Sequence, residues 1–180
     1  MAMKLLSSQT AADAGAIAFT SSIAGFNSDY KLYIFKFIDM NPEDDSVDLL
    51  FNGSIDAGSN YNVSKTTSFF DARHNEADDS AALEYQAGRD LAEATTGHSI
   101  TMQTGTGADE SGAGTLWLFN PSNTTYVKHF CSRLSNYRAT NASLDCFTGG
   151  YFNTTSDIDA VNFAFYSGNM NGTIKMYGVG

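Results

Sequence analysis

The side chains best suited to acid–base, nucleophilic or metal chemistry are three histidines and two cysteines: His74, His98, His129, Cys131 and Cys146. No histidine lies at a metal-ligand spacing from another histidine or a cysteine. The acidic run after His74, which contains Glu76, Asp78 and Asp79, does not follow the ligand order of a calcium loop. We therefore predict no metal site.

Sequence motifs for hydrolysis or phosphate binding do not stand out either. There is no G-x-S-x-G nucleophile elbow. The neighbouring carboxylates Asp44 and Asp45 are not evidence of two groups facing each other across a cleft, as sugar hydrolysis requires. Gly105-Thr-Gly107 is followed by acidic residues rather than by the lysine of a phosphate loop. We predict no catalytic residue, no cofactor and no enzymatic activity.

Cys131 and Cys146 lie on two runs, 130–134 and 144–147, that we expect to pair as a hairpin. If the hairpin closes near residues 137–140, the two thiols lie opposite each other, within disulfide reach in the non-hydrogen-bonded register. A reducing cytoplasm would instead keep both thiols free. Both alternatives remain open, and without a C-x-x-C motif a disulfide would be a cross-link and not a redox centre.

The elements that carry these side chains are predicted to be strands. Short apolar or alternating runs recur between clusters of Gly, Asn, Asp and Ser, which is typical of an all-β fold. We predict an antiparallel, jelly-roll-like β-sandwich of eight to ten strands. Asn52-Gly53 is expected to form a turn. Residues 90–94 could form a short helix, although Gly88 interrupts the pattern. The predicted strands cover residues 16–20, 30–39, 47–51, 67–74, 114–119, 126–134, 144–152, 161–165 and 174–177.

The 180 residues fit one domain. We predict an N-terminal arm or extended segment over residues 1–14 and a single β-sandwich domain over residues 15–180.

The run 30–39 carries apolar residues on both faces, which indicates a strand covered by the core on one side and by a neighbouring subunit on the other. Tyr33, Phe35 and Phe37 on one face are candidates for either core or interface, and we favour the core because large apolar side chains are usually buried. Tyr126 and Tyr177, on runs that alternate with polar residues, are candidate interface residues.

The formal net charge is −10, from 10 basic and 20 acidic residues. This sign argues against binding to nucleic acid, whose affinity comes mainly from Lys and Arg, and against an anionic membrane surface. The N-terminus lacks the apolar region of a secretory signal. We therefore expect a protein made in the cytoplasm, which it could leave as part of a particle.

Several stretches resemble small virion structural proteins of tailed bacteriophages from marine and freshwater hosts. In the C-terminal half they are residues 110–121, 124–130 followed by 149–160, and 167–178; in the N-terminal half, 33–39 and 51–53 are similar too. The resemblance therefore covers most of the chain. It implies a structural role in the virion, reached from the host cytoplasm.

A compact acidic chain without a fibrous shaft fits a capsid decoration (cement) protein that stabilises the outer shell by bridging capsid subunits. The resemblance then implies two partners, the major capsid protein and copies of the chain itself in a homotrimer. The alternative is a tail- or head-fibre-associated module that binds a receptor or carbohydrate.

Overall fold

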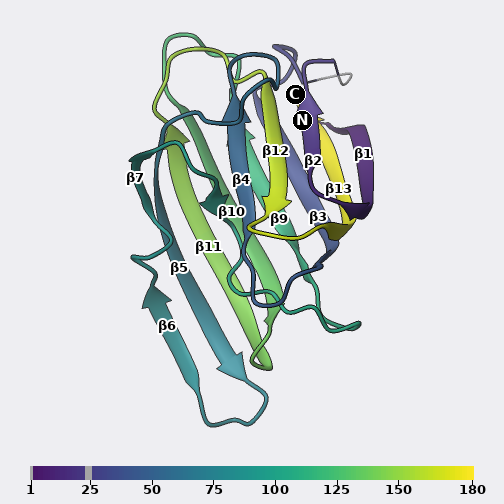
Figure 1. Ribbon diagram of the computed structural model, residues 1–180. Helices are drawn as coiled ribbons and strands as arrows, with labels where there is room; N and C mark the ends of the chain where they lie inside the picture. Colours follow the sequence, from purple (N-terminus) through teal and green to yellow (C-terminus); the bar gives the residue numbers. More distant parts are fainter. Residues whose placement is uncertain (1, 23–25) are drawn as a thin grey trace.

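The computed structural model describes residues 2–22 and 26–180, and it shows two antiparallel β-sheets packed as a sandwich (Figure 1). In these ranges the strands are β1 (Met3–Ala14), β2 (Ile17–Thr20), β3 (Leu32–Pro42), β4 (Leu49–Ser54), β5 (Lys65–Asn75), β6 (Ala81–Tyr85), β7 (Leu91–Ala94), β8 (His98–Ser99), β9 (Gly112–Phe119), β10 (Lys128–Arg138), β11 (Ala142–Phe152), β12 (Ala160–Phe165) and β13 (Met170–Val179). The predicted all-β sandwich is confirmed, with thirteen strands in the described ranges instead of eight to ten.

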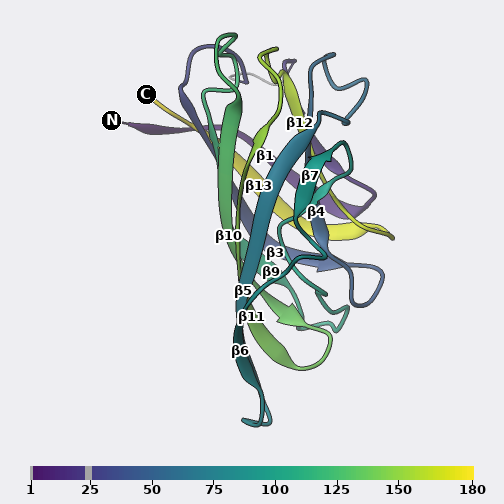
Figure 2. The same ribbon diagram turned by 90° about the vertical axis from the view of Figure 1, so that its left-hand side faces the viewer.

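The two sheets are unequal in size. The large sheet has the order β1-β13-β3-β9-β10-β11-β5-β6, with β7 also paired to β5, and the small sheet has the order β2-β12-β4-β8. Figure 2 shows the large sheet nearly edge-on, with β6 and the adjoining end of β5 extending beyond the rest of the sandwich. One face of the large sheet therefore packs on the small sheet, and its other face points away from the core.

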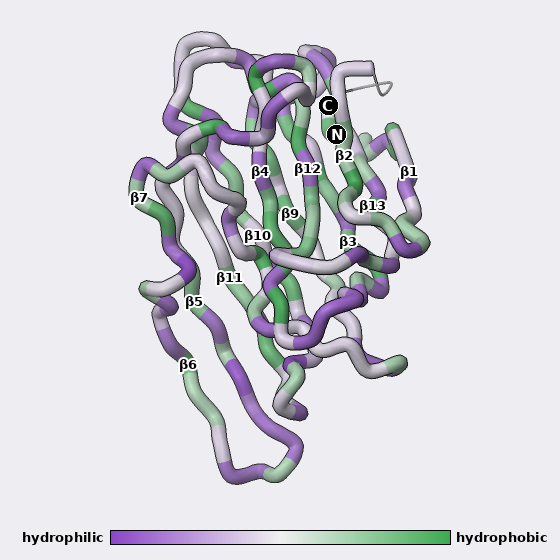
Figure 3. Tube along the Cα trace, viewed as in Figure 1, coloured by the Kyte–Doolittle hydropathy of each residue, from purple (hydrophilic) through white to green (hydrophobic). Residues whose placement is uncertain are grey.

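Aromatic rings from both sheets form the core between them. Phe163 on the small sheet stacks on Phe51 at 5.4 Å and meets Phe35 of the large sheet at 5.3 Å between ring centroids. All three side chains are fully buried. Figure 3 shows hydrophobic residues concentrated along β4, β9, β10 and β12, where the two layers face each other. Burial of such rings is the main stabilising term of a sandwich.

A smaller apolar cluster lies beneath the segment that connects β8 to β9. It contains Phe69, Met102, Ala142, Leu144 and Cys146. The Asn136 side chain donates to the Met102 carbonyl at 3.0 Å, and this hydrogen bond holds the connecting segment on the inner face of the large sheet. The segment thereby covers sheet area that the four-stranded small sheet does not reach.

The N-terminal segment is built into the large sheet. Residues 1–14 were expected to form an arm or extended segment; β1 pairs with β13 from Met3 to Ala14, with register shifts near Leu5 and Ala11. Met1, and residues 23–25 of the expected 15–180 domain, lie outside the described residues.

The expected turn at Asn52-Gly53 is wrong, because β4 continues through both residues to Ser54. The Asn52 amide donates to the carbonyls of Tyr61 and Thr95, at 2.5 Å and 3.1 Å, so it serves a buried strand position instead of a turn. A Cβ on Gly53 would lie 2.7 Å from the Phe152 ring. The glycine therefore permits the close approach of an aromatic ring, which is another role of glycine within strands.

The short helix considered for residues 90–94 is also wrong. The chain makes a tight turn in which the Arg89 N–H donates to the Gln86 carbonyl at 2.9 Å. It then forms strand β7 from Leu91, whose N–H donates to the Thr67 hydroxyl at 2.9 Å. Pairing with β5 overrides the local preference of Ala and Glu for a helix.

Asp48 links separate parts of the chain on the small-sheet side. One carboxylate accepts hydrogen bonds from Arg89 Nε at 2.8 Å, from the Ser99 hydroxyl at 2.9 Å and from the Gln103 N–H at 2.8 Å. The Asp48 side chain is only 15% exposed. This half-buried carboxylate fixes the turn before β7 and the segment after β8 relative to each other.

We predict that Asp48→Ala lowers the free energy of unfolding by about 3 kcal/mol, because it leaves a guanidinium, a hydroxyl and an N–H without their acceptor. Chemical denaturation monitored by tryptophan fluorescence measures this change. The control Asp44→Ala removes an exposed carboxylate nearby and should change stability by less than about 0.5 kcal/mol. Equal effects of the two substitutions would contradict the linking role of Asp48.

Candidate binding surface on the large sheet

Two adjacent rows of apolar side chains cross the outer face of the large sheet. Strand register aligns Met3 with Val179, Leu32 and Phe119, and the next outward row aligns Leu5 with Tyr177, Ile34 and Trp117. Their chain neighbours Tyr33, Leu118 and Met176 are buried in the core, so the rows point to the opposite face. We call these eight residues the apolar face: Met3, Leu5, Leu32, Ile34, Trp117, Phe119, Tyr177 and Val179.

Members of the apolar face are unusually accessible for such side chains. Met3 is 50% exposed, Leu5 is 49% exposed and Phe119 is 41% exposed. Each of the other five is half-buried by its neighbours within the rows. Single exposed apolar residues are ordinary on protein surfaces, but a contiguous group of them marks an interaction site.

Positively charged side chains border one side of the apolar face, and one of them, Arg133, is paired with Asp145 at 2.6 Å. The next outward row contains Lys175, Lys36 and Arg133, joined by cross-strand register through Thr115. The Lys36 ammonium lies 5.9 Å from the centre of the Tyr177 ring, within cation–π range. The apolar face and this row contain no carboxylate, although the chain carries 20 acidic and 10 basic residues.

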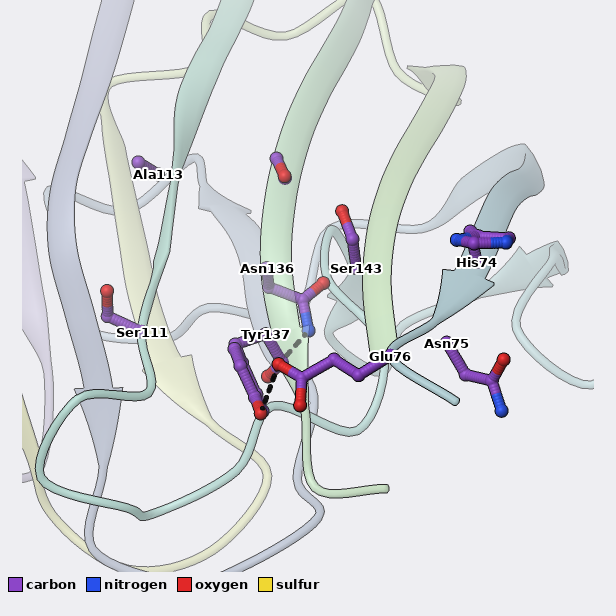
Figure 4. A pocket seen from close by; sticks show the side chains of 9 residues that line it. His74, Asn75, Glu76, Ser111, Ala113, Asn136, Tyr137 and Ser143 are labelled. Atoms are coloured by element: carbon purple, nitrogen blue, oxygen red, sulfur yellow. Dashed lines mark hydrogen bonds between the residues drawn. The ribbon is translucent and has the colours of Figure 1, made fainter. Parts of the chain in front are cut away.

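A polar hollow of about 440 Å³ opens at the other end of β9 and extends over the neighbouring strands β10, β11 and β5 (Figure 4). Side chains from β5, β9, β10 and β11 and from the residues next to them line it: His74, Asn75, Glu76, Ser111, Ala113, Ser135, Asn136, Tyr137 and Ser143. Figure 4 shows Glu76 and Tyr137 directed toward each other. The hollow therefore combines hydroxyl, amide, imidazole and carboxylate groups with one aromatic ring.

Hydrogen bonds fix part of the hollow and leave other groups available. The Tyr137 hydroxyl donates to Glu76 Oε1 at 2.9 Å, and this bond, with burial and the nearby carboxylates of Glu110 and Asp109, raises the pKa of Tyr137. His74 Nε2 lies 3.0 Å from Asp78 Oδ1. Tyr137 therefore stays protonated as a donor near neutral pH.

The structure places His74 directly opposite Ser143 across the β5–β11 pair. Ser143, His74 and Asp78 thus follow one another in the order of the serine, histidine and aspartate of a hydrolase triad, with Asp78 bonded to the His74 imidazole. No hydrogen bond joins the Ser143 hydroxyl to His74 in the described structure, and the side chain of Asp78 is 89% exposed. A catalytic series needs the base bonded to the nucleophile and shielded from water. The geometry of these three groups therefore does not match a catalytic series of this kind.

The interface candidates chosen from the sequence fall in three different places. Tyr33, Phe35 and Phe37 are fully or almost fully buried on the inner face, so they are core residues and not interface residues. Tyr126 is 71% exposed and lies in the loop before β10, not on a strand. Tyr177 belongs to the apolar face.

Most residues of the apolar face were missed because each run was considered alone. Trp117 and Phe119 occupy a short run of consecutive apolar residues. Such a run normally indicates a strand that is buried on both faces. The available signal was the run 30–39, whose second face carries Leu32 and Ile34. Cross-strand register, which the sequence does not state, was needed to join that face to β9 and β13.

Of the two alternatives left open for Cys131 and Cys146, the structure has both thiols free and no disulfide between them. The β10–β11 hairpin forms, but Cys131 pairs with Gly149 and Cys146 pairs with Leu134. Cys131 lies on the outer face next to Trp117, whereas Cys146 is buried on the inner face. Thiols on opposite faces of one sheet cannot be bridged. Burial raises the pKa of both, so both are weak nucleophiles.

A buried polar cluster lies between the sheets, apart from both surfaces. The Lys65 ammonium donates to the Thr96 carbonyl at 2.6 Å, and the Thr67 hydroxyl lies 3.2 Å from His98 Nδ1. His98 Nε2 is buried with no hydrogen-bond partner among the described residues. Burial lowers the pKa of Lys65 to about 8. Burial together with the nearby Lys65 charge lowers the pKa of His98 to about 3.

This cluster predicts a specific acid sensitivity. An unfolded histidine has a pKa near ~6.5, so between that pH and about 3 the unfolded chain binds a proton that the folded chain excludes. The neutral, buried His98 therefore stabilises the fold fully above pH ~6.5. This contribution to the free energy of unfolding decreases as the pH falls toward about 3. Relative to His98→Phe, the wild-type chain should lose about 3 kcal/mol of unfolding free energy between about pH 7 and 4.

Denaturation curves of both chains at several pH values measure this difference. His74→Phe, which removes an exposed histidine, serves as the control and should follow the wild-type pH dependence. Parallel curves for the wild type and His98→Phe would contradict the assignment.

Two further structural findings concern ligands and membranes. Residues 2–22 and 26–180 contain no group of three or more His, Cys, Asp or Glu side chains placed to hold a metal ion. The same residues include no helix with the length and apolarity needed to cross a membrane.

Comparison with known proteins adds no assignment: no family model matches the chain, and no curated protein is detectably similar to it.

Proposed function

We propose that this chain is a structural protein of a bacteriophage virion, a capsid decoration protein that binds the shell through its apolar face. The apolar face carries the proposal, because eight apolar side chains from four strands form two continuous rows on the surface. The phage assignment itself comes from the resemblance of the sequence to small virion proteins. An exposed group of this composition matches the buried centre of protein–protein interfaces, where aromatic residues are enriched and charges are rare.

The occupant of the apolar face is the major capsid protein. Lys36 and Lys175 border the rows, so the favoured partner offers apolar side chains together with carboxylates. Two copies of the chain packed with these faces together would bring like charges into contact. Copies in the proposed homotrimer therefore meet through other surfaces, in agreement with the heterologous contacts that three-fold symmetry requires.

Stabilisation of the shell follows from binding energy alone. The apolar face spans the four adjacent strands β1, β13, β3 and β9, a width of roughly 14 Å, and it would stabilise the shell where it lies across a boundary between two capsid subunits. A module that contacts both subunits binds the assembled shell and not the separated subunits. It therefore shifts the equilibrium toward the shell by mass action.

Capsid binding is tested with the substitution Leu5→Asp, which places a carboxylate on the exposed part of the apolar face. Binding to purified shells of the major capsid protein should weaken by about tenfold or more. Shells carrying the wild-type chain should resist higher temperatures than bare shells. Co-sedimentation and calorimetry measure these two effects.

Leu83→Asp is the matched control, because Leu83 is 72% exposed on β6 at the far edge of the sheet, and it should bind like the wild type. Equal binding by all three chains would overturn the proposal.

Quantitative mass spectrometry of particles adds a second criterion. A copy number comparable with that of the capsid protein supports shell decoration, and a copy number matching the tail components contradicts it.

A further inference from the structure

We propose that the polar hollow binds a neutral saccharide, independently of the apolar face. Its volume of about 440 Å³ lies in the range of small-molecule sites. Its walls come from four neighbouring strands and from residues directly next to their ends. Sites built on strands hold their side chains more rigidly than sites on loops.

The groups available in the hollow suit a ligand with several hydroxyls. The hydroxyls of Ser111, Ser135 and Ser143 line it and make no hydrogen bond within the described part of the chain. Each serine hydroxyl both donates and accepts, and so does each sugar hydroxyl. A polyol can therefore engage all three without leaving a donor or an acceptor unpaired.

Tyr137 and Glu76 provide the fixed part of the site. The 2.9 Å hydrogen bond between them orients the carboxylate and holds the half-buried tyrosine ring in one position. A ring fixed in this way offers a flat apolar surface to the C–H face of a sugar, and the second carboxylate oxygen remains an acceptor. The methyl group of Ala113 adds a further small apolar contact.

The local charge selects against anionic ligands. Glu76 lines the hollow, and the carboxylates of Asp109 and Glu110 lie near enough to influence Tyr137. Lysine and arginine are absent from the lining. Phosphate, sulfate and acidic sugars would therefore be repelled, which leaves neutral saccharides as the favoured class.

The position of the hollow allows it to act while the apolar face is covered. On β9, Ala113 lines the hollow, and Trp117 of the apolar face lies four residues further, about 13 Å away along the strand. A chain docked through the apolar face would therefore leave the hollow uncovered, at the other end of β9 and on β10, β11 and β5. A virion-bound copy could thus hold saccharides of a cell surface.

An NMR titration of the full chain tests this proposal, with D-galactose, D-mannose and N-acetyl-D-glucosamine as neutral probes and D-galacturonate as the anionic probe. At millimolar concentration at least one neutral probe should shift the amide signals of Glu76, Tyr137 and Ser143. D-Galacturonate should bind more weakly than D-galactose. Tyr137→Phe, which releases Glu76 from its hydrogen bond but keeps the ring, should weaken binding about tenfold.

Ser68→Ala is the matched control, because Ser68 is an exposed serine of the same outer face outside the hollow, and it should bind like the wild type. Leu5→Asp should also bind saccharide normally, which separates this proposal from capsid binding. The proposal is overturned if no neutral probe shifts these amides, if the shifts map elsewhere, if D-galacturonate binds more tightly than D-galactose, or if Tyr137→Phe and Ser68→Ala bind equally.

Discussion

The packing of Phe163 against rings of both sheets is the interaction on which the rest of this structure depends. Its ring meets Phe35 and Phe37 of the large sheet at 5.3 Å and 5.0 Å, and it meets Phe51 of its own sheet at 5.4 Å. These contacts require β3, β4 and β12 to turn Phe35, Phe37, Phe51 and Phe163 inward. Because side chains alternate along a strand, a slip of one residue would place the whole set in water. The core thus fixes the register of both sheets.

Once the register is fixed, the residues left on the outer face need a separate explanation. The core already uses Tyr33, Phe35 and Leu118, yet their neighbours Ile34, Trp117 and Phe119 are apolar too. Exposed apolar area of this extent stabilises nothing in the isolated chain. On β10 and β11 the outer face of the same sheet becomes polar, because the outward positions there hold Ser135 and Ser143. We interpret this division as two binding surfaces that share one rigid support.

Much of the architecture follows from the sequence because local patterns determine it. Alternation in the runs around Phe51 and Phe163, and the turn residues between such runs, were sufficient to predict an all-β sandwich. The incorrect predictions concern places where distant parts of the chain decide the outcome. Gly53 lies in a strand because Phe152 packs on it, and residues 91–94 form a strand because β5 pairs with them. The polar hollow could not be predicted, since its residues come together only through the order of β9, β10, β11 and β5.

If the apolar face binds the capsid, hydroxyl-radical footprinting will distinguish the particle-bound chain from the free chain. Trp117, Phe119 and Tyr177 should become protected in the particle. Leu83 and Tyr85, exposed on β6, should react equally in both states. Unchanged reactivity of Trp117 and Phe119 in the particle-bound chain would show that the apolar face is not the contact surface.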